Sequence, residues 1–134
     1  MYLITGVAGF IGMHFAKKML DKGYKVLGVD NLNDYYDTKL KKNRVLILKK
    51  YKNFKFLKSD LKSLNTYRQI NKSKITHIVH LAGQAGVRYS IKNPGAYVND
   101  NIMAYVNLLE AFKYSKKLKC IVYASSSSVY GKSR

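Results

Sequence analysis

A glycine-rich turn between two apolar segments constrains the fold of this chain more than any other feature. The apolar run 2–5 leads directly into the segment Gly6–Gly12, a helical pattern covers about 11–22, and a second apolar run over 25–29 ends at Asp30. The order strand, glycine turn, helix, strand and acid is the one that a dinucleotide-binding βαβ unit requires. An ordinary strand-to-helix turn is the alternative, because glycine turns are common.

Each glycine of the turn has its own physical role in such a unit. Gly6 makes the tight turn, Gly9 lets the pyrophosphate approach the backbone, and Gly12 lets the helix pack against the strand. The N–H groups at the start of the helix, including those of Phe10 and Ile11, then face the phosphates because they lack partners within the helix. The turn therefore predicts the phosphate part of a cofactor site.

Asp30 indicates which cofactor to expect. It falls about 20 residues past the turn, where a carboxylate accepts hydrogen bonds from the ribose hydroxyls. A carboxylate would repel the 2′-phosphate of NADP, and no Arg or Lys directly follows Asp30 to offset that repulsion. We therefore expect NAD to be preferred over NADP.

Length and composition place the chain among single-domain globular proteins. It has 134 residues, 47% of them hydrophobic, and no apolar run reaches the roughly 20 residues of a membrane span. The N-terminus lacks the pattern of a signal peptide, and the one cysteine, Cys120, excludes an internal disulfide. Cys120 lies in an apolar run and is expected to be a buried, inert thiol. These features suit the cytoplasm and predict no membrane partner.

The net charge of +18 raises the question of a nucleic-acid partner. One basic stretch carries many of the charges, namely Lys39, Lys41, Lys42, Arg44, Lys49, Lys50, Lys52, Lys55 and Lys58. A solvated surface is the favoured interpretation, because Lys, Asn, Ile and Tyr are abundant throughout the chain. A basic nucleic-acid-binding module is the alternative.

Strand and helix patterns alternate along the chain, which indicates a parallel sheet covered on both faces. The predicted strands lie near 2–5, 25–29, 54–57, 76–81 and 119–124. The predicted helices cover about 11–22, 38–50, 63–72 and 97–115. They predict an α/β fold of the Rossmann type, a doubly wound parallel sheet with strand order 3-2-1-4-5 that stops after its fifth strand.

Apolar stripes predict how two of the helices pack. The stripe of the first helix is Ile11, Phe15, Met19 and Leu20, and Gly23 stands where a C-terminal glycine cap belongs. The stripe of the last helix is Val98, Ile102, Tyr105, Leu108, Leu109 and Phe112. His80, at the end of the fourth strand, is interpreted as a core histidine, and no cluster of residues has metal-ligand spacing.

In a doubly wound sheet the ligand lies beyond the carboxyl ends of the strands. Small, polar and acidic residues follow all five predicted strands, namely Gly6 to Gly12, Asp30, Asn31, Asp60, Leu61, Leu81, Ala82, Gly83 and Ser125 to Ser128. The agreement between strand pattern and residue type predicts one ligand site at this edge of the sheet.

With these residues the whole chain resembles the extended short-chain dehydrogenase/reductase family, which includes the NAD-dependent epimerases and dehydratases of nucleotide sugars. Thr5–Gly12 resembles the family's glycine turn, Val29–Asn31 its ribose-binding acid, and His80–Gly83 the segment under the cofactor. The resemblance also implies that Asp60 and Leu61 lie beside the adenine.

Two longer segments, Val29–Asp37 and His80–Ser90, closely resemble the UDP-glucuronate 4-epimerases of this family. Those enzymes make UDP-galacturonate by oxidation at C4 with bound NAD, rotation of the 4-keto sugar and hydride return to the other face. The resemblance thus implies NAD as the cofactor, a UDP-sugar as the substrate and a homodimer in the full-length form.

Catalysis in the family uses Ser or Thr, Tyr and Lys, and this chain matches only the first. Ser126 aligns with the catalytic hydroxyl that would hold the sugar O4, and Ser128 is expected to face the substrate. Arg88 could reach a cofactor phosphate or the uronate carboxylate, or be an ordinary surface residue. The family's Tyr-x-x-x-Lys pair and C-terminal substrate domain would follow Gly131, and the sequence ends first. Tyr35 with Lys39 and Tyr51 with Lys55 have the spacing but lie at or before the third predicted strand, so they are not assigned to catalysis. We therefore expect 1–134 to be a single, incomplete NAD-binding domain.

Other functions remain open from the sequence. The first is another nucleotide-sugar epimerase or dehydratase of the same family. Dehydratases carry an Asp-Glu pair after the catalytic hydroxyl, whereas Ser127 and Ser128 stand there in this chain, which disfavours dehydration. The second is a non-catalytic NAD-binding remnant, so enzyme activity of the chain itself stays undecided.

Overall fold

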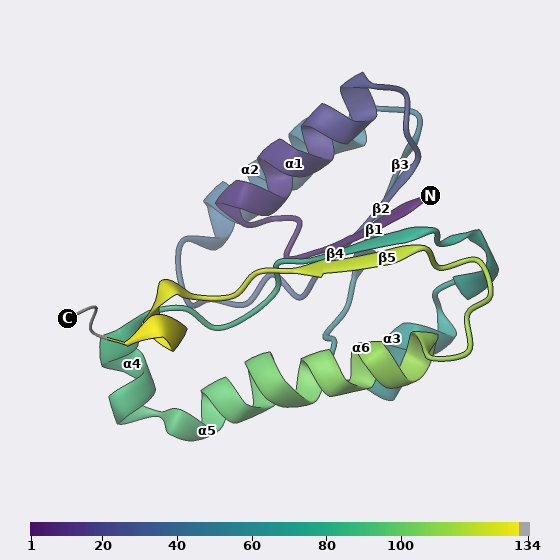
Figure 1. Ribbon diagram of the computed structural model, residues 1–134. Helices are drawn as coiled ribbons and strands as arrows, with labels where there is room; N and C mark the ends of the chain where they lie inside the picture. Colours follow the sequence, from purple (N-terminus) through teal and green to yellow (C-terminus); the bar gives the residue numbers. More distant parts are fainter. Residues whose placement is uncertain (132–134) are drawn as a thin grey trace.

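A five-stranded parallel sheet forms the centre of the computed structural model, which describes residues 1–131 without the side chains of Ser127 and Ser128 (Figure 1). The strands are β1 (Tyr2–Thr5), β2 (Val26–Asp30), β3 (Phe54–Lys58), β4 (His77–His80) and β5 (Cys120–Tyr123). Their order is β3-β2-β1-β4-β5 and every pair is parallel. The predicted order 3-2-1-4-5 is confirmed.

Helices of different lengths connect the strands. The α-helices are α1 (Phe10–Asp21), α2 (Thr38–Lys49), α3 (Leu64–Arg68), α4 (Val87–Lys92), α5 (Pro94–Tyr97) and α6 (Ala104–Phe112). Between them lie the 3₁₀ helices η1 (Lys72–Lys74) and η3 (Ser127–Tyr130) and the π-helical segment η2 (Val98–Met103). The sequence predicts a longer third helix than α3 and does not predict α4.

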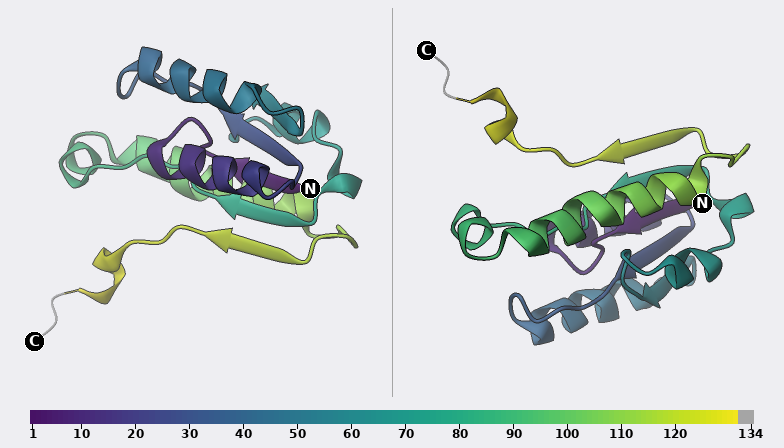
Figure 2. Two further views of the ribbon diagram at one scale, coloured as in Figure 1. Left: turned by 90° about the horizontal axis from the view of Figure 1, so that it is seen from above. Right: turned by 90° about the horizontal axis from the view of Figure 1, so that it is seen from below.

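One layer of helices covers each face of the sheet, with α1 and α2 on one side and α3 and α6 on the other (Figures 1 and 2). The central strand β1 packs against both layers of helices, because successive side chains of a strand point to opposite faces of the sheet. Leu3 packs in a cluster with Leu108 of α6, and Ile4 packs in a cluster with Ala16 of α1. Burial on both faces explains why this strand reads as a continuous apolar run.

The buried face of α1 differs from the predicted stripe at its first residue. Gly12, Ala16 and Leu20 are buried, and a Cβ at Gly12 would lie 2.2 Å from the carbonyl oxygen of Gly6. This close contact sets the rotation of the helix and turns Ile11 outward, where it is 66% exposed. The prediction that Ile11 faces the core is therefore wrong.

The end of α1 follows the prediction. Gly23 has φ +81°, its N–H donates to the carbonyl oxygen of Leu20 at 2.9 Å, and the Tyr24 N–H donates to that of Met19 at 3.1 Å. These two bonds form a Schellman motif, which needs a left-handed residue at the position of Gly23. The predicted glycine cap is confirmed.

The predicted helix over 97–115 is divided into α5, η2 and α6. A π-helical turn contains an extra residue, so the apolar period does not run unchanged through η2. Leu108 and Phe112 are buried as predicted, whereas Val98 and Ile102 are exposed. The prediction of one continuous buried stripe is wrong for Val98 and Ile102 and also for Leu109 of α6, which is 38% exposed.

Strand β5 lies at the edge of the sheet and is covered less than the sequence suggests. Ile121 packs partly against the core, but Cys120, Val122 and Tyr123 are exposed. The prediction of a buried thiol at Cys120 is wrong, because an edge strand has a neighbouring strand on one side only. No helix in the described part of the chain is long and apolar enough to cross a membrane.

Candidate functional site

A pocket lies at the carboxyl ends of the strands, beside the turn between β1 and α1. Its lining includes most of the residues expected there, namely Gly6, Gly9, Asp30, Asn31, Asp60, Leu61, Leu81, Ala82 and Gly83. The sheet brings these residues together from the loops after β1, β2, β3 and β4. With Asp100 and Ala104, which also line it, one pocket collects segments that are up to 98 positions apart in the chain.

The glycine turn is shaped by close approaches of the backbone. Gly6 has φ +67°, and a Cβ there would lie 2.7 Å from the amide nitrogen of Ala82. Gly9 directly precedes α1, and its N–H donates to the carbonyl oxygen of Gly6 at 3.0 Å. The N–H groups of the first turn of α1 have no acceptors within the helix, which makes them suitable donors for an anion.

Asp30 is fixed by two backbone N–H groups. Its Oδ2 accepts a hydrogen bond from Ala8 N at 3.0 Å, and its Oδ1 accepts one from Leu32 N at 2.9 Å. Each carboxylate oxygen keeps a further lone pair. Asp30 is thus attached to the glycine turn and still able to accept hydrogen bonds from a ligand in the pocket.

Lys41 of α2 also lines the pocket, and the sequence analysis did not single it out. Its ammonium donates to the carbonyl oxygen of Asn33 at 2.8 Å and to the Asn33 side chain, and it lies 4.2 Å from the centre of the Tyr36 ring. Burial lowers the pKa of Lys41, although Asp30 and Asp34 partly oppose this effect.

A signal for Lys41 does exist in the sequence. Lys41, Val45 and Leu48 are the buried residues of α2, and their spacing is that of one helical face. A lysine on an otherwise apolar face is therefore brought into the pocket. The cation in the pocket thus comes from α2 and not from the residues next to Asp30 in the sequence.

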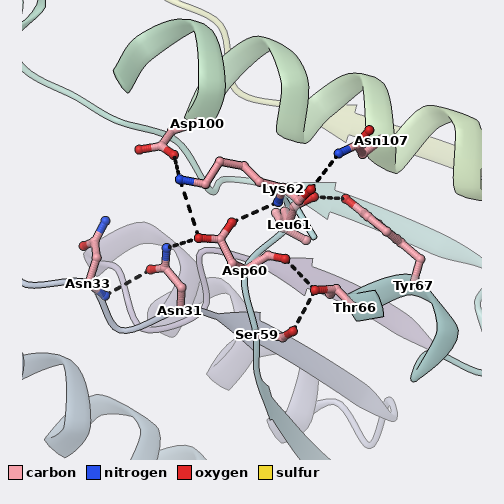
Figure 3. Close-up of polar contacts among 10 residues, drawn as sticks. All are labelled: Asn31, Asn33, Ser59, Asp60, Leu61, Lys62, Thr66, Tyr67, Asp100 and Asn107. Carbon is pink, nitrogen blue, oxygen red and sulfur yellow. Dashed lines mark hydrogen bonds and ion pairs between the residues drawn. The ribbon is translucent and has the colours of Figure 1, made fainter. Parts of the chain in front are cut away.

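Polar contacts around Asp60 connect the loop after β3 with its neighbours (Figure 3). Asp60 accepts a hydrogen bond from Asn31 Nδ2 at 3.2 Å, and Lys62 Nζ lies 3.6 Å from Asp60 and 2.6 Å from Asp100. The hydrogen bond with Asp100 raises the pKa of Lys62. These contacts fix the wall of the pocket that carries Asp60 and Leu61.

Thr5 fixes the residues after β4. The N–H groups of Leu81 and Ala82 both donate to Thr5 Oγ1 at 3.2 Å, and His80 Nδ1 lies 2.8 Å from the same oxygen. Because a hydroxyl has two lone pairs and one proton, the Thr5 hydroxyl donates its proton to His80 Nδ1. Burial lowers the pKa of His80 to about 4, so the ring is neutral at pH 7. The interpretation of His80 as a core histidine is confirmed.

Comparison with known proteins identifies the family. The family profile described as GDP-mannose 4,6 dehydratase matches residues 3–134. The chain belongs to this family. The match bears out the sequence-based resemblance to NAD-dependent epimerases and dehydratases.

Two named relatives illustrate the similarity within the GDP-mannose 4,6-dehydratase family. The chain is 47% identical over 130 residues to UDP-glucuronate 4-epimerase 2 of Arabidopsis thaliana. The aligned part is 96% of this chain and 30% of that protein. It is 48% identical over 130 residues to the UDP-glucuronate 4-epimerase of Thermodesulfobacterium geofontis, with 96% of this chain and 40% of that protein covered.

Solved structures agree with these relatives. The UDP-glucuronic acid 4-epimerase of Bacillus cereus, in complex with UDP-glucuronic acid and NAD, superposes with a TM-score of 0.83 at 34% identity. The alignment covers 99% of this chain and 42% of that one. A mutant of the same enzyme, with NAD and a 4-fluoro substrate analogue, gives a TM-score of 0.87. The chain therefore spans less than half the length of these relatives.

The remaining residues singled out from the sequence lie outside the pocket lining. Gly12 is buried beneath the turn, whereas Phe10 and Ile11 point into solvent with exposures of 65% and 66%. Arg88 is exposed on α4 rather than in a loop, and Ser126 is exposed between β5 and η3. The side chain of Ser128 is outside the described residues. Within 1–131, no three His, Cys, Asp or Glu residues are arranged to hold a metal ion.

The lowered pKa of His80 predicts a loss of stability in acid. The pKa of the His80 ring is about 6.5 in the unfolded chain and about 4 in the folded chain. Below pH 6.5 the unfolded chain therefore binds the proton more strongly, so the free energy of unfolding is highest above pH 6.5 and falls below it. We expect the free energy of unfolding to drop by about 2 kcal/mol between pH 7 and pH 5. Urea titrations should show a flatter pH dependence for His80→Gln. His14→Gln removes an exposed histidine and should leave the parent's dependence unchanged.

Proposed function

We propose that this chain is the NAD-binding part of a nucleotide-sugar 4-epimerase that acts on UDP-glucuronate. The observation that carries the proposal is the pocket itself, where Asp30, fixed by Ala8 N and Leu32 N, stands beside a glycine turn. The extent of the similarity to UDP-glucuronate 4-epimerases, 96% of this chain, supports the substrate.

The residues present fit NAD. Asp30 would accept hydrogen bonds from the adenosine ribose, and Gly9 with the first N–H groups of α1 would hold the pyrophosphate. Asp60 and Leu61 would flank the adenine, while Leu81, Ala82 and Gly83 would lie under the middle of the dinucleotide.

Catalysis would combine the cofactor with groups of the protein. When bound, NAD supplies the redox chemistry at sugar C4. Ser126 would hold the sugar O4 through its hydroxyl, next to a tyrosine that removes the proton. Ser128 and Arg88 are proposed as further substrate contacts, Arg88 through a bidentate bond with the uronate carboxylate.

A chimera tests the function. Residues 1–134 are joined to the C-terminal part of the Thermodesulfobacterium geofontis epimerase, which is 48% identical over the aligned part. We expect this protein to convert UDP-glucuronate to UDP-galacturonate, measured by chromatography of the two UDP-sugars. A folded chimera that binds NAD but forms no UDP-galacturonate would contradict the proposed substrate. Formation of a 4-keto-6-deoxy sugar from another nucleotide sugar would favour a dehydratase.

The cofactor preference gives a separate prediction. We expect NADP to bind at least about 10-fold more weakly than NAD, because its 2′-phosphate would meet the Asp30 carboxylate. Titration calorimetry on the 134-residue chain measures both affinities. Asp30→Ala should weaken the binding of NAD by about 1–3 kcal/mol and narrow the difference between the affinities for NAD and NADP. Glu110→Ala removes an exposed acid of α6 outside this pocket and should leave both affinities unchanged. Tighter binding of NADP than of NAD by the parent would exclude this role of Asp30.

The full-length form is proposed to be a homodimer in the cytoplasm. Exposed apolar side chains on η2 and α6, among them Val98, Ile102 and Leu109, support a protein partner for that face. The lysines of α2 and β3 are proposed to be a solvated surface rather than a nucleic-acid site, and no membrane partner is proposed.

A further inference from the structure

The loop after β4 is held from two sides of the pocket. Asn101 of η2 makes two bonds with Gln84, accepting from its N–H at 2.6 Å and donating to its carbonyl oxygen at 3.1 Å. The next carbonyl oxygen, that of Ala85, accepts hydrogen bonds from the Tyr35 and Tyr97 hydroxyls, both at 2.8 Å. The single proton of the Tyr97 hydroxyl is shared with the carbonyl oxygen of Gly86, which lies even closer to it, and Gln84 Nε2 also donates to Ala85 O at 3.3 Å.

Aromatic packing and the backbone conformation support the same contact. The Tyr89 ring lies between the other two, with centroid distances of 5.4 Å to Tyr35 and 6.2 Å to Tyr97. Gly86 has φ +103°, and a Cβ there would lie only 2.5 Å from the Tyr35 hydroxyl. The Tyr97 hydroxyl carries the proton that it donates at neutral pH, as a tyrosine ordinarily does, and desolvation raises its pKa further.

The contact between Tyr35 and Ala85 spans the centre of the sheet. Tyr35 follows β2 and Ala85 follows β4, while β1 with its glycine turn lies between these strands. The loop of Tyr35 also lines the pocket through Asn33 and Tyr36, and the loop of Ala85 lines it through Gly83. The hydrogen bond from Tyr35 to Ala85 therefore joins the two walls of the pocket across the turn.

We propose that Tyr35 and Tyr97 form a clasp that closes the segment Gln84–Gly86 over a bound dinucleotide and slows its exchange. This inference rests on the proposed NAD binding. All contacts of the clasp are made within the chain, so the clasp has to open for a cofactor to enter as well as to leave. Weakening it should raise the association and dissociation rates together and change the affinity little.

Stopped-flow fluorescence of NADH tests the clasp on the 134-residue chain. Association is followed on mixing, and dissociation is followed by displacement with excess NAD. Loss of one neutral hydrogen bond predicts that Tyr35→Phe and Tyr97→Phe each raise both rates about fivefold, and the double variant about 20-fold. Tyr114→Phe removes an exposed hydroxyl beyond the far end of α6 and should leave both rates unchanged.

The outcomes separate the clasp from the proposed function. Unchanged rates in the double variant, or faster dissociation with unchanged association, would overturn the clasp while NAD binding stands. Failure of the parent chain to bind NADH and NAD would overturn the proposed function and the clasp together. Hydrogen exchange adds a readout that needs no ligand, since the Tyr89 and Ser90 amides, which bond to Gly86 O, should exchange faster in the double variant than in Tyr114→Phe.

Discussion

Gly9→Val is expected to lower the affinity for NAD by about 100-fold or more while leaving the far-ultraviolet circular dichroism unchanged. Gly9 has φ −69° and ψ 169°, a conformation that valine adopts freely, and its Cβ would lie 3.0 Å from the carbonyl oxygen of Gly6. The fold therefore tolerates the substitution with a small shift. The added side chain at the start of α1 would occupy space proposed for the pyrophosphate. Titration calorimetry measures the loss.

A second glycine provides the matched control. Gly95 of α5 has only Asn93 Oδ1 near its Cβ position, at 3.9 Å, so Gly95→Val adds the same side chain in open space. This variant should bind NAD like the parent. Normal binding by Gly9→Val would mean that the phosphates do not lie at the glycine turn.

Ser126→Ala is expected to reduce turnover of the active chimera by about 10²-fold or more, the usual scale for losing a positioned acid–base participant. The expectation follows from the position of Ser126 three residues after the end of β5, at the carboxyl edge of the sheet that also carries the pocket. Steady-state rates of UDP-galacturonate formation measure the effect. Ser125→Ala alters the preceding exposed serine and should retain most of the activity. Comparable rates for both variants would remove Ser126 from the catalytic step.

The sheet could be predicted from the sequence because its signals are local. Each strand is a short apolar run followed by a polar or glycine-rich break, and burial of β1 and β4 on both faces makes these runs continuous. The glycine turn and the cap at Gly23 were readable for a similar reason. A left-handed backbone or a close approach selects glycine at one position, whatever the distant surroundings are.

The features that the sequence did not predict depend on contacts between distant segments. The outward turn of Ile11 follows from the contact of Gly12 with Gly6, and the exposure of Val98 follows from a π-helical turn that has no apolar signature. The burial of Lys41 in the pocket was not predicted, because a charged residue on a helix is ordinarily assigned to the solvated face. Its burial depends on an acceptor, the carbonyl oxygen of Asn33, that only the folded loop provides.

The Thr5 hydroxyl uses all its hydrogen-bonding groups, and this connects the protonation of His80 with cofactor binding. A proton added to Nδ1 of His80 would need an acceptor, and Thr5 Oγ1 already accepts from the amides of Leu81 and Ala82. The charged ring can therefore form only by loosening the backbone on which the dinucleotide is proposed to rest. Protonation of His80 and occupancy of the pocket then compete, and by reciprocity a bound dinucleotide makes the imidazole harder to protonate.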